Sequence, residues 1–253
     1  MLNSPKITIL NVDDNDVSRY LVTEILHHEG FEVMEAATGG EALQLSATIP
    51  DLIILDVHLP DMSGYEVCRQ VRANPATAAI PILHLSSTSV DDQSKVTGLD
   101  NGADGFLTHP VPKFVLTASV RSLIRTRQKD MELLAAARQW QVTFDAVTDL
   151  IWLMDAEHMI LQCNKATIRF LGKPSREIVG RPCYQVIHKL SGPIQGCPAM
   201  CVKDTLCREE QILSENNRWF NLTVDPIIDQ GGNLVGFVHI MSDITDRKRM
   251  EED

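Results

Sequence analysis

Residues 6 to 125 alternate short runs of aliphatic and β-branched residues with longer amphipathic stretches. A parallel sheet with helical crossovers requires this order of elements. The run at 52–57 is apolar on both faces, which predicts a central strand that helices cover on each side. Asn15 and Gly30 are residue types that begin and end a helix between the first two runs. We therefore predict a doubly wound α/β domain with strands at 7–12, 31–35, 52–57, 80–85 and 105–107.

Polar side chains stand at the carboxyl ends of these predicted strands, where doubly wound folds bind their ligands. Asp13 and Asp14 follow the first strand, Asp56 lies at the end of the third, Ser86 follows the fourth and His109 follows the fifth. The fold would bring them to one edge of one sheet. Three carboxylates that repel one another require a hard cation there, and Mg²⁺ with oxygen ligands fits. Helix capping is the alternative, but it accounts for one acid and not for three at separate strand ends.

Several motifs in this region occur in a fixed order: Val12-Asp13-Asp14, the stretch DVHLPDMSG from Asp56 to Gly64, Ser86, and the stretch GADGFLTHP from Gly102 to Pro110. With these motifs the sequence resembles the receiver domains of response regulators, the phosphoaccepting proteins of two-component signalling. The resemblance covers nearly all of residues 6 to 125. It implies a flavodoxin-like (βα)5 fold for a domain spanning residues 1–125.

The same resemblance implies that Asp56 is the phosphoacceptor. Asp13, Asp14 and Asp56 would bind Mg²⁺, and the backbone carbonyl of His58 would complete the protein ligands. Phosphoryl transfer asks a protein mainly for positioning and charge neutralisation, so a carboxylate nucleophile beside a metal suffices. The implied partner is a cognate histidine kinase or phosphotransfer protein.

Three further residues are implied to form the switch that responds to phosphorylation: Ser86, Phe106 and His109. Ser86 would turn toward the phosphoryl group, and Phe106 would change rotamer. His109 departs from the family, which usually carries a lysine before this proline; histidine is shorter and can be uncharged near neutral pH. A degenerate receiver that serves only as a scaffold therefore stays an alternative.

A long helix is predicted to follow, from Leu116 to about Phe144, because neither Gly nor Pro interrupts the sequence there. Apolar residues recur three and four positions apart along this helix, but they form only a weak coiled-coil stripe. One interpretation is a single amphipathic helix packed on its own domains. The other is a helical pair between two copies of the chain, with residues 126–143 as a signalling linker and a homodimer formed through this linker and the following domain.

Residues 144–253 are predicted to form a second, α+β domain with an antiparallel sheet. Short alternating strands are expected at 151–154, 160–164, 219–227 and 234–241, with helices between the early pair and the late pair. Alternation places Phe220, Leu222 and Val224 on one face of a strand. The glycines at 231 and 232 are expected to form the turn before the last strand.

The second domain resembles a PAS domain in three short motifs: Asn164-Lys165-Ala166, Leu171-Gly172, and the stretch SDITDR from Ser242 to Arg247. The last motif implies a signal exit at Asp243, Thr245 and Arg247. No motif matches flavin attachment or a covalent chromophore, so the sequence leaves the PAS ligand unknown.

Four cysteines and a histidine gather in one stretch of this domain: Cys183, His188, Cys197, Cys201 and Cys207. They could bind zinc or an iron-sulfur cluster, or sense oxidant. Their spacing lacks the repeated CxxC pairs of most such sites. The other interpretation is that they are small buried apolar residues.

The net charge of −11 argues against a nucleic-acid partner, because binding phosphates requires a basic face. The longest apolar runs are too short for a membrane span, and the polar N-terminus is unlike a signal peptide, so a cytoplasmic protein is expected. The sequence thus predicts a phosphorelay protein that couples a receiver to a PAS sensor and dimerisation domain. Two alternatives stay open: the N-terminal portion of a hybrid sensor histidine kinase, the one case in which the chain would belong to an enzyme, and a metal or redox sensor with the receiver as scaffold.

Overall fold

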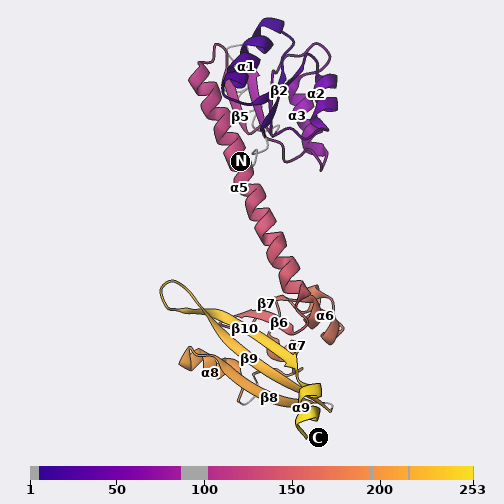
Figure 1. Cartoon of the computed structure of the whole chain (residues 1–253), viewed down its shortest axis with the longest axis vertical. Helices are drawn as coiled ribbons and strands as arrows, with labels where there is room; N and C mark the ends of the chain where they lie inside the picture. The colour runs from indigo at the N-terminus through magenta and orange to yellow at the C-terminus, as the bar shows by residue number, and fades with distance from the viewer. Residues whose placement is uncertain (1–5, 87–101, 194–195, 216, 253) are drawn as a thin grey trace. The chain divides into compact units, whose positions relative to one another are not determined.

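The computed structural model describes residues 6–86, 102–193, 196–215 and 217–252. The chain divides into two compact units, Met1–Ala135 and Ala136–Asp253 (Figure 1). The division falls inside helix α5 (Lys113–Ala146), which contains the stretch predicted as a linker. Each unit has its own sheet and its own hydrophobic core.

The sheet of the first unit is parallel and has the strand order β2-β1-β3-β4-β5. All five predicted strands are present with slightly shifted ends: β1 (Thr8–Val12), β2 (Glu32–Ala36), β3 (Leu52–Leu55), β4 (Ile82–Ser86) and β5 (Gly105–Thr108). The order reverses beside β1 and β3, whose carboxyl ends therefore border the crevice where doubly wound folds bind ligands. The predicted doubly wound, flavodoxin-like fold is confirmed.

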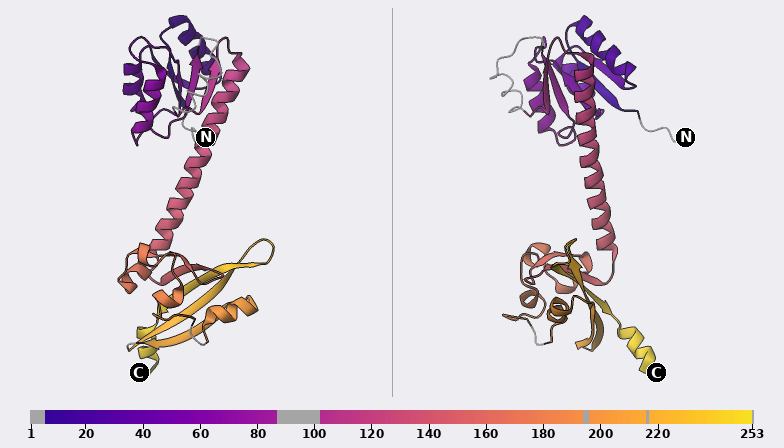
Figure 2. Two further views of the ribbon diagram at one scale, coloured as in Figure 1. Left: turned by 180° about the vertical axis from the view of Figure 1, so that it is seen from behind. Right: turned by 90° about the vertical axis from the view of Figure 1, so that its left-hand side faces the viewer.

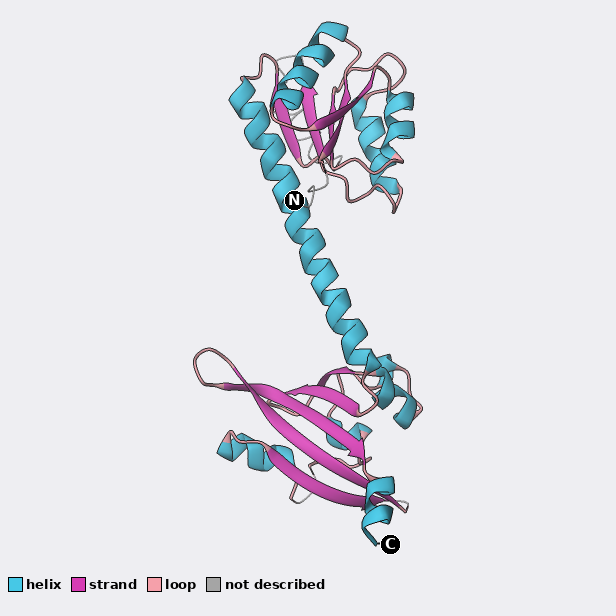
Figure 3. Cartoon of the chain, viewed as in Figure 1, coloured by secondary structure: helices cyan, strands magenta, loops and turns pink. Residues whose placement is uncertain are grey.

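Helices cover both faces of this sheet (Figure 3). Helices α1 (Asp16–His28) and α5 pack on one face, and α2 (Gly39–Ser46) and α3 (Gly64–Ala73) pack on the other. Asn15 caps α1 by accepting hydrogen bonds from the backbone N–H groups of Val17 and Ser18. Gly30 follows the helix with a φ of 89°, which only glycine adopts readily. Both predicted helix ends are therefore confirmed.

Helix α5 packs through its first turns and is exposed further along. Leu116 and Val120 are fully buried in the first unit, whereas Met131, Leu133 and Leu134 are exposed. Beyond them, the rings of Trp140 and Phe144 stack with centroids 4.9 Å apart. No helix within the described residues has both the length and the apolar character needed to cross a membrane.

The second unit has an antiparallel sheet of order β7-β6-β10-β9-β8, with helices packed on one face (Figure 2). The elements in chain order are β6 (Leu150–Asp155), β7 (Ile160–Cys163), α6 (Lys165–Leu171), the 3-10 helix η1 (Ser175–Glu177), α7 (Cys183–Val186), α8 (Pro198–Thr205), β8 (Glu209–Glu215), β9 (Arg218–Ile228), β10 (Leu234–Asp243) and α9 (Thr245–Glu252). Phe220, Leu222 and Val224 are buried on one face of β9, as alternation predicts. The sequence did not predict β8, a polar edge strand.

Candidate functional site

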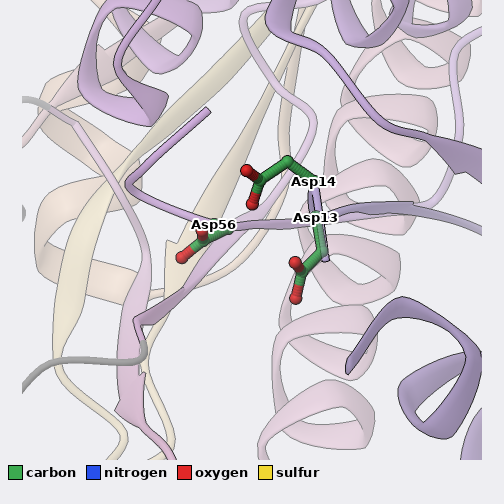
Figure 4. A group of neighbouring side chains, drawn as sticks. All are labelled: Asp13, Asp14 and Asp56. Atoms are coloured by element: carbon green, nitrogen blue, oxygen red, sulfur yellow. The ribbon is translucent and has the colours of Figure 1, made fainter. Parts of the chain in front are cut away.

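Three carboxylates lie together at the carboxyl edge of the parallel sheet (Figure 4). Asp13 and Asp14 directly follow β1, and Asp56 directly follows β3, which is hydrogen-bonded to β1. One carboxylate oxygen of each lies within 4.8 Å of the others. Among the described residues, no other group of three His, Cys, Asp or Glu side chains is so close. The predicted juxtaposition of these acids is present.

The carboxylate of Asp13 is held by the start of α1. The backbone N–H of Asn15 donates to Asp13 Oδ1 at 2.8 Å, and the hydroxyl of Ser18 donates to Oδ2 at 2.5 Å. The guanidinium of Arg19 donates to the backbone carbonyl of Asp13 at 2.6 Å. Asp13 therefore has a fixed orientation, whereas Asp14 is exposed.

Asp56 is buried like Asp13, with 7% of the residue exposed against 6% for Asp13. Burial raises the pKa of Asp56 to about 6; the backbone N–H groups of Val57 and His58 favour its charged form, and Asp13 opposes it. The N–H of Val57 donates to Asp56 Oδ1 at 2.8 Å. A cation beside this carboxyl group would favour its ionised form.

The oxygen atoms of this cluster suit a hard divalent cation. Mg²⁺ binds through one or two carboxylates and keeps several waters, so a site that is open on one side and has three carboxylates fits it. His58 lines the same hollow in the surface as Asp13, Asp14 and Asp56, as a further ligand from its backbone would require. The donors present are thus consistent with Mg²⁺.

The acidic cluster lines one side of a hollow of about 590 Å³ that also has an apolar side. Val17, Leu21 and Ile25 of α1 form one wall, and Pro110 and Val111 also line the hollow. Val17 and Leu21 are largely exposed although they are aliphatic. The carboxylate cluster and an open apolar surface therefore adjoin each other.

The structure places the three predicted switch residues on β4, on β5 and just after β5. Ser86 ends β4 and is fully buried, and Phe106 on β5 is partly buried, 6.3 Å from the ring of His84 between centroids. His109 precedes Pro110 through a cis peptide bond, and its backbone N–H donates to the carbonyl of Ser86 at 2.8 Å. Sequence reasoning missed Ser18: its hydroxyl lies 3.5 Å from His109 Nε2 and donates to Asp13, so it joins His109 to the acidic cluster.

The predicted exit motif of the second unit forms a hydrogen-bonded junction at the start of α9. Asp243 Oδ1 accepts from the hydroxyl of Thr245 at 2.5 Å and from its backbone N–H at 3.0 Å. The hydroxyl of Thr245 accepts from the backbone N–H of Trp219 at 2.9 Å. The hydrogen bonds from Thr245 and the pairing with Arg218 lower the pKa of Asp243 to about 2. The junction therefore ties α9 to both β9 and β10.

Arg247 lies apart from this junction, because its guanidinium is exposed and faces Glu251 within α9. Arg218 of β9 is the arginine that pairs with Asp243. Sequence reasoning missed Arg218, because only the register of β9 beside β10 brings it next to the exit motif.

Replacing Asp243 with alanine is expected to destabilise the second unit by about 1–2 kcal/mol, because the Thr245 N–H and hydroxyl lose their acceptor. Tryptophan fluorescence during urea unfolding measures this unit alone, since all three tryptophans, Trp140, Trp152 and Trp219, follow residue 135. Asp246→Ala, which removes an exposed acid of the same helical turn, is the control. Equal effects of the two substitutions would contradict the junction.

The cysteine cluster does not assemble a metal site in the described part of the chain. Cys183 and Cys197 are buried, but Cys201 and Cys207 are exposed. Cys197 is the residue before α8, and Cys201 lies within that helix. None of these thiols, nor His188, belongs to a group of three ligands within 4.8 Å in the described residues. Burial raises the pKa of Cys183 to about 11, which keeps this thiol protonated at neutral pH.

Comparison with known proteins agrees with both folds. The family model of the response regulator receiver domain matches residues 9–121, and that of the PAS domain matches residues 148–246. The chain belongs to the response regulator family of two-component signalling proteins and carries a PAS domain after its receiver domain.

Two curated relatives and one solved structure illustrate the similarity. The response regulator PleD of Caulobacter vibrioides is 40% identical over 119 residues, 46% of this chain and 26% of PleD. The transcriptional regulatory protein TrcR of Mycobacterium tuberculosis is 34% identical over 179 residues, 69% of this chain and 68% of TrcR. A crystal structure of a response regulator from Chloroflexus aurantiacus has 36% identity and a TM-score of 0.46, covering 47% of this chain and 98% of that one. The chain spans about a quarter of the length of PleD.

Proposed function

We propose that Asp56 accepts a phosphoryl group from a partner protein. The observation that carries this proposal is the cluster of Asp13, Asp14 and Asp56 at the carboxyl edge of a receiver sheet. In the transfer, a carboxylate oxygen of Asp56 forms a bond to phosphorus while the bond from phosphorus to the donor's leaving atom breaks.

Asp13, Asp14 and Asp56, with the backbone carbonyl of His58, would hold Mg²⁺. The ion would supply positive charge that neutralises both the acids and the incoming phosphoryl oxygens. The residues of the chain do the positioning. Asn15 and Ser18 orient Asp13, and the backbone N–H of Val57 orients Asp56.

The apolar surface beside the acids supports docking of a protein donor. Val17 and Leu21 offer an exposed aliphatic surface next to Asp56, as a docking helix of a histidine kinase or phosphotransfer protein requires. The donor would present its phosphorylated side chain over the acidic edge while its apolar face covers α1.

Ser86, Phe106 and His109 would transmit phosphorylation. The backbone N–H of His109 donates to the carbonyl of Ser86, and the hydroxyl of Ser18 contacts both His109 and Asp13. A change of charge at Asp56 would therefore act on the end of β5 through these contacts. Helix α5 begins a few residues after β5 ends. In this proposal α5 couples the receiver to the PAS domain, which serves as sensor and dimerisation domain.

A homodimer through α5 and the PAS domain is part of this proposal. It is supported by the exposed apolar residues along α5: Met131, Leu133, Leu134, Trp140 and Val142. The hybrid-kinase and metal-sensor alternatives are not favoured: the relatives reported above are response regulators, and the described cysteines do not converge.

The test is phosphorylation by acetyl phosphate in the presence of Mg²⁺. We expect one phosphoryl group per chain on Asp56, and we expect Asp56→Asn to remove it completely. Asp16→Asn, which changes an exposed acid on the first turn of α1, should leave labelling unchanged. Labelling of Asp56→Asn at the parent level would overturn the proposal. Removal of Mg²⁺ with a chelator should reduce labelling of the parent to background.

A further inference from the structure

An enclosed hollow lies in the core of the PAS domain, between the sheet and helices α7 and α8. The centre of a water molecule can occupy a volume of about 40 Å³ inside it. Trp152 and His239 line the sheet side, and Cys183 and Cys197 line the helix side. A volume of this size holds about three waters or a ligand of about three to four non-hydrogen atoms.

Two residues that line this hollow carry buried nitrogen atoms without hydrogen-bond partners in the described structure. Trp152 is 3% exposed and its indole Nε1–H has no hydrogen-bond partner within the described structure. His239 is 4% exposed, and neither Nδ1 nor Nε2 has a partner there. The two residues are directly paired on β6 and β10, with ring centroids 5.0 Å apart. Buried polar groups without partners are costly, and such a pair at one cavity indicates that something else completes their hydrogen bonds.

The chemistry of the lining defines what can enter. No Asp, Glu, Lys or Arg is among the described residues that line the hollow, and the polar side chains there besides Trp152 and His239 are those of His188, Gln211 and two cysteines, so an ionised ligand would have no permanently charged partner. Burial lowers the pKa of His239 to about 3, so its imidazole is neutral and has one donor and one acceptor nitrogen. Trp152 adds a second donor. A complementary ligand is uncharged and carries both an acceptor and a donor.

A metal ion fits this hollow less well. The histidine and cysteine side chains around it do not bring three ligand atoms within 4.8 Å of one another in the described residues.

We propose that Trp152 and His239 form the recognition site of the PAS domain for a small uncharged molecule with both a hydrogen-bond donor and an acceptor, such as a primary amide or an alcohol. This proposal rests on the sensory role proposed above for the PAS domain. His239 also connects the hollow to the exit junction. It lies on β10, which ends at Asp243, and Asp243 accepts a hydrogen bond from Thr245 at the start of α9. Occupancy of the hollow would thus act on the strand that ends at the exit junction.

Acetamide and acetate distinguish this class of ligand, because they have nearly the same shape and differ in charge. In ¹⁵N–¹H spectra of the full chain, Trp140, Trp152 and Trp219 give three indole signals, and Trp152→Phe identifies the relevant one. We expect acetamide to shift the Trp152 signal saturably and acetate to leave it in place. His239→Phe should weaken acetamide binding about tenfold or more, equivalent to about 1.4 kcal/mol. His28→Gln, in the receiver, should leave binding unchanged.

Two outcomes would overturn the proposal: a Trp152 signal that shows contacts to water only and does not respond to acetamide, or an equal response to acetate. The amide signal of Thr245 separates this failure from that of the sensory role. A saturable Trp152 shift without any change at Thr245 would support the binding site while counting against signalling through the exit. Loss of both responses would remove the site and leave the test of Asp56 unaffected.

Discussion

Gly64→Ala is expected to abolish phosphorylation of Asp56 and to destabilise the receiver by about 3 kcal/mol or more. A Cβ atom at residue 64 would lie 2.1 Å from the backbone oxygen of Asp56 and 3.0 Å from the Cα of Val57. The obstacle is backbone, so no side-chain rotation relieves it. Because the Gly64 N–H also donates to the carbonyl of Val57 at 2.8 Å, α3 cannot move away without losing that contact. The strain therefore falls on the segment that carries Asp56, the proposed phosphoacceptor.

Calorimetry of the full chain and acetyl phosphate labelling measure the two effects of Gly64→Ala. All three tryptophans lie in the second unit, so tryptophan fluorescence reports the unfolding of that unit. A calorimetric transition without a matching change in fluorescence is therefore the unfolding of the receiver. Gly40→Ala is the matched control: its added Cβ would meet only the Asp61 carboxylate, at 3.4 Å, near the start of α2. A Gly64→Ala protein with parental labelling and an unchanged receiver transition would show that this backbone contact is unimportant.

The second unit is expected to lose stability as pH falls from about 6.5 toward 3, because His239 stays neutral when folded. Burial is the main cause of its lowered pKa, and the nearby His158 and His188 contribute. Above pH 6.5 the group is neutral in both states and has no effect. Below that value the unfolded chain takes up a proton that the folded chain refuses, which favours unfolding by up to about 1.4 kcal/mol per pH unit.

His239→Phe tests this pH dependence, since phenylalanine keeps an aromatic ring beside Trp152 and has no proton to take up. Urea unfolding followed by tryptophan fluorescence should show a shallower loss of stability in the variant between pH 6.5 and 4. Some slope should persist, because burial also lowers the pKa of His158. At pH 8 the variant should be at least as stable as the parent, since two unpartnered buried nitrogens are removed. Parallel pH profiles for the two proteins would contradict the assignment to His239.

The α/β fold and the acidic cluster could be predicted from sequence because both depend on local patterns. Alternation of apolar strands with amphipathic helices fixes the class of sheet, and parallel strands bring their carboxyl ends together. Asp13, Asp14 and Asp56 each directly follow a strand, so their proximity follows from the topology alone. The buried face of β9 could also be predicted from the sequence, because Phe220, Leu222 and Val224 alternate with more polar neighbours.

The remaining features depend on register and packing, which the sequence alone does not reveal. Strand β8 begins with two glutamates and pairs with one neighbour only, so it lacks the apolar signal of a central strand. The contacts of Ser18 with His109 and of Arg218 with Asp243 join residues far apart in the chain. Likewise, Trp152 and His239 look like ordinary strand residues until their register places both side chains at one hollow.

The exposed aliphatic surface of α1 also affects how long a docked donor would stay. Val17 and Leu21 form a small apolar wall beside the acids, much less than the area that a permanent complex buries. Affinity at contacts of this kind is set mainly by the rate of dissociation, so a small wall shortens the residence time of the partner. A short residence time would let one phosphorylated donor be replaced by the next after each transfer. The modest size of this surface thus favours repeated turnover of the partner over a stable assembly.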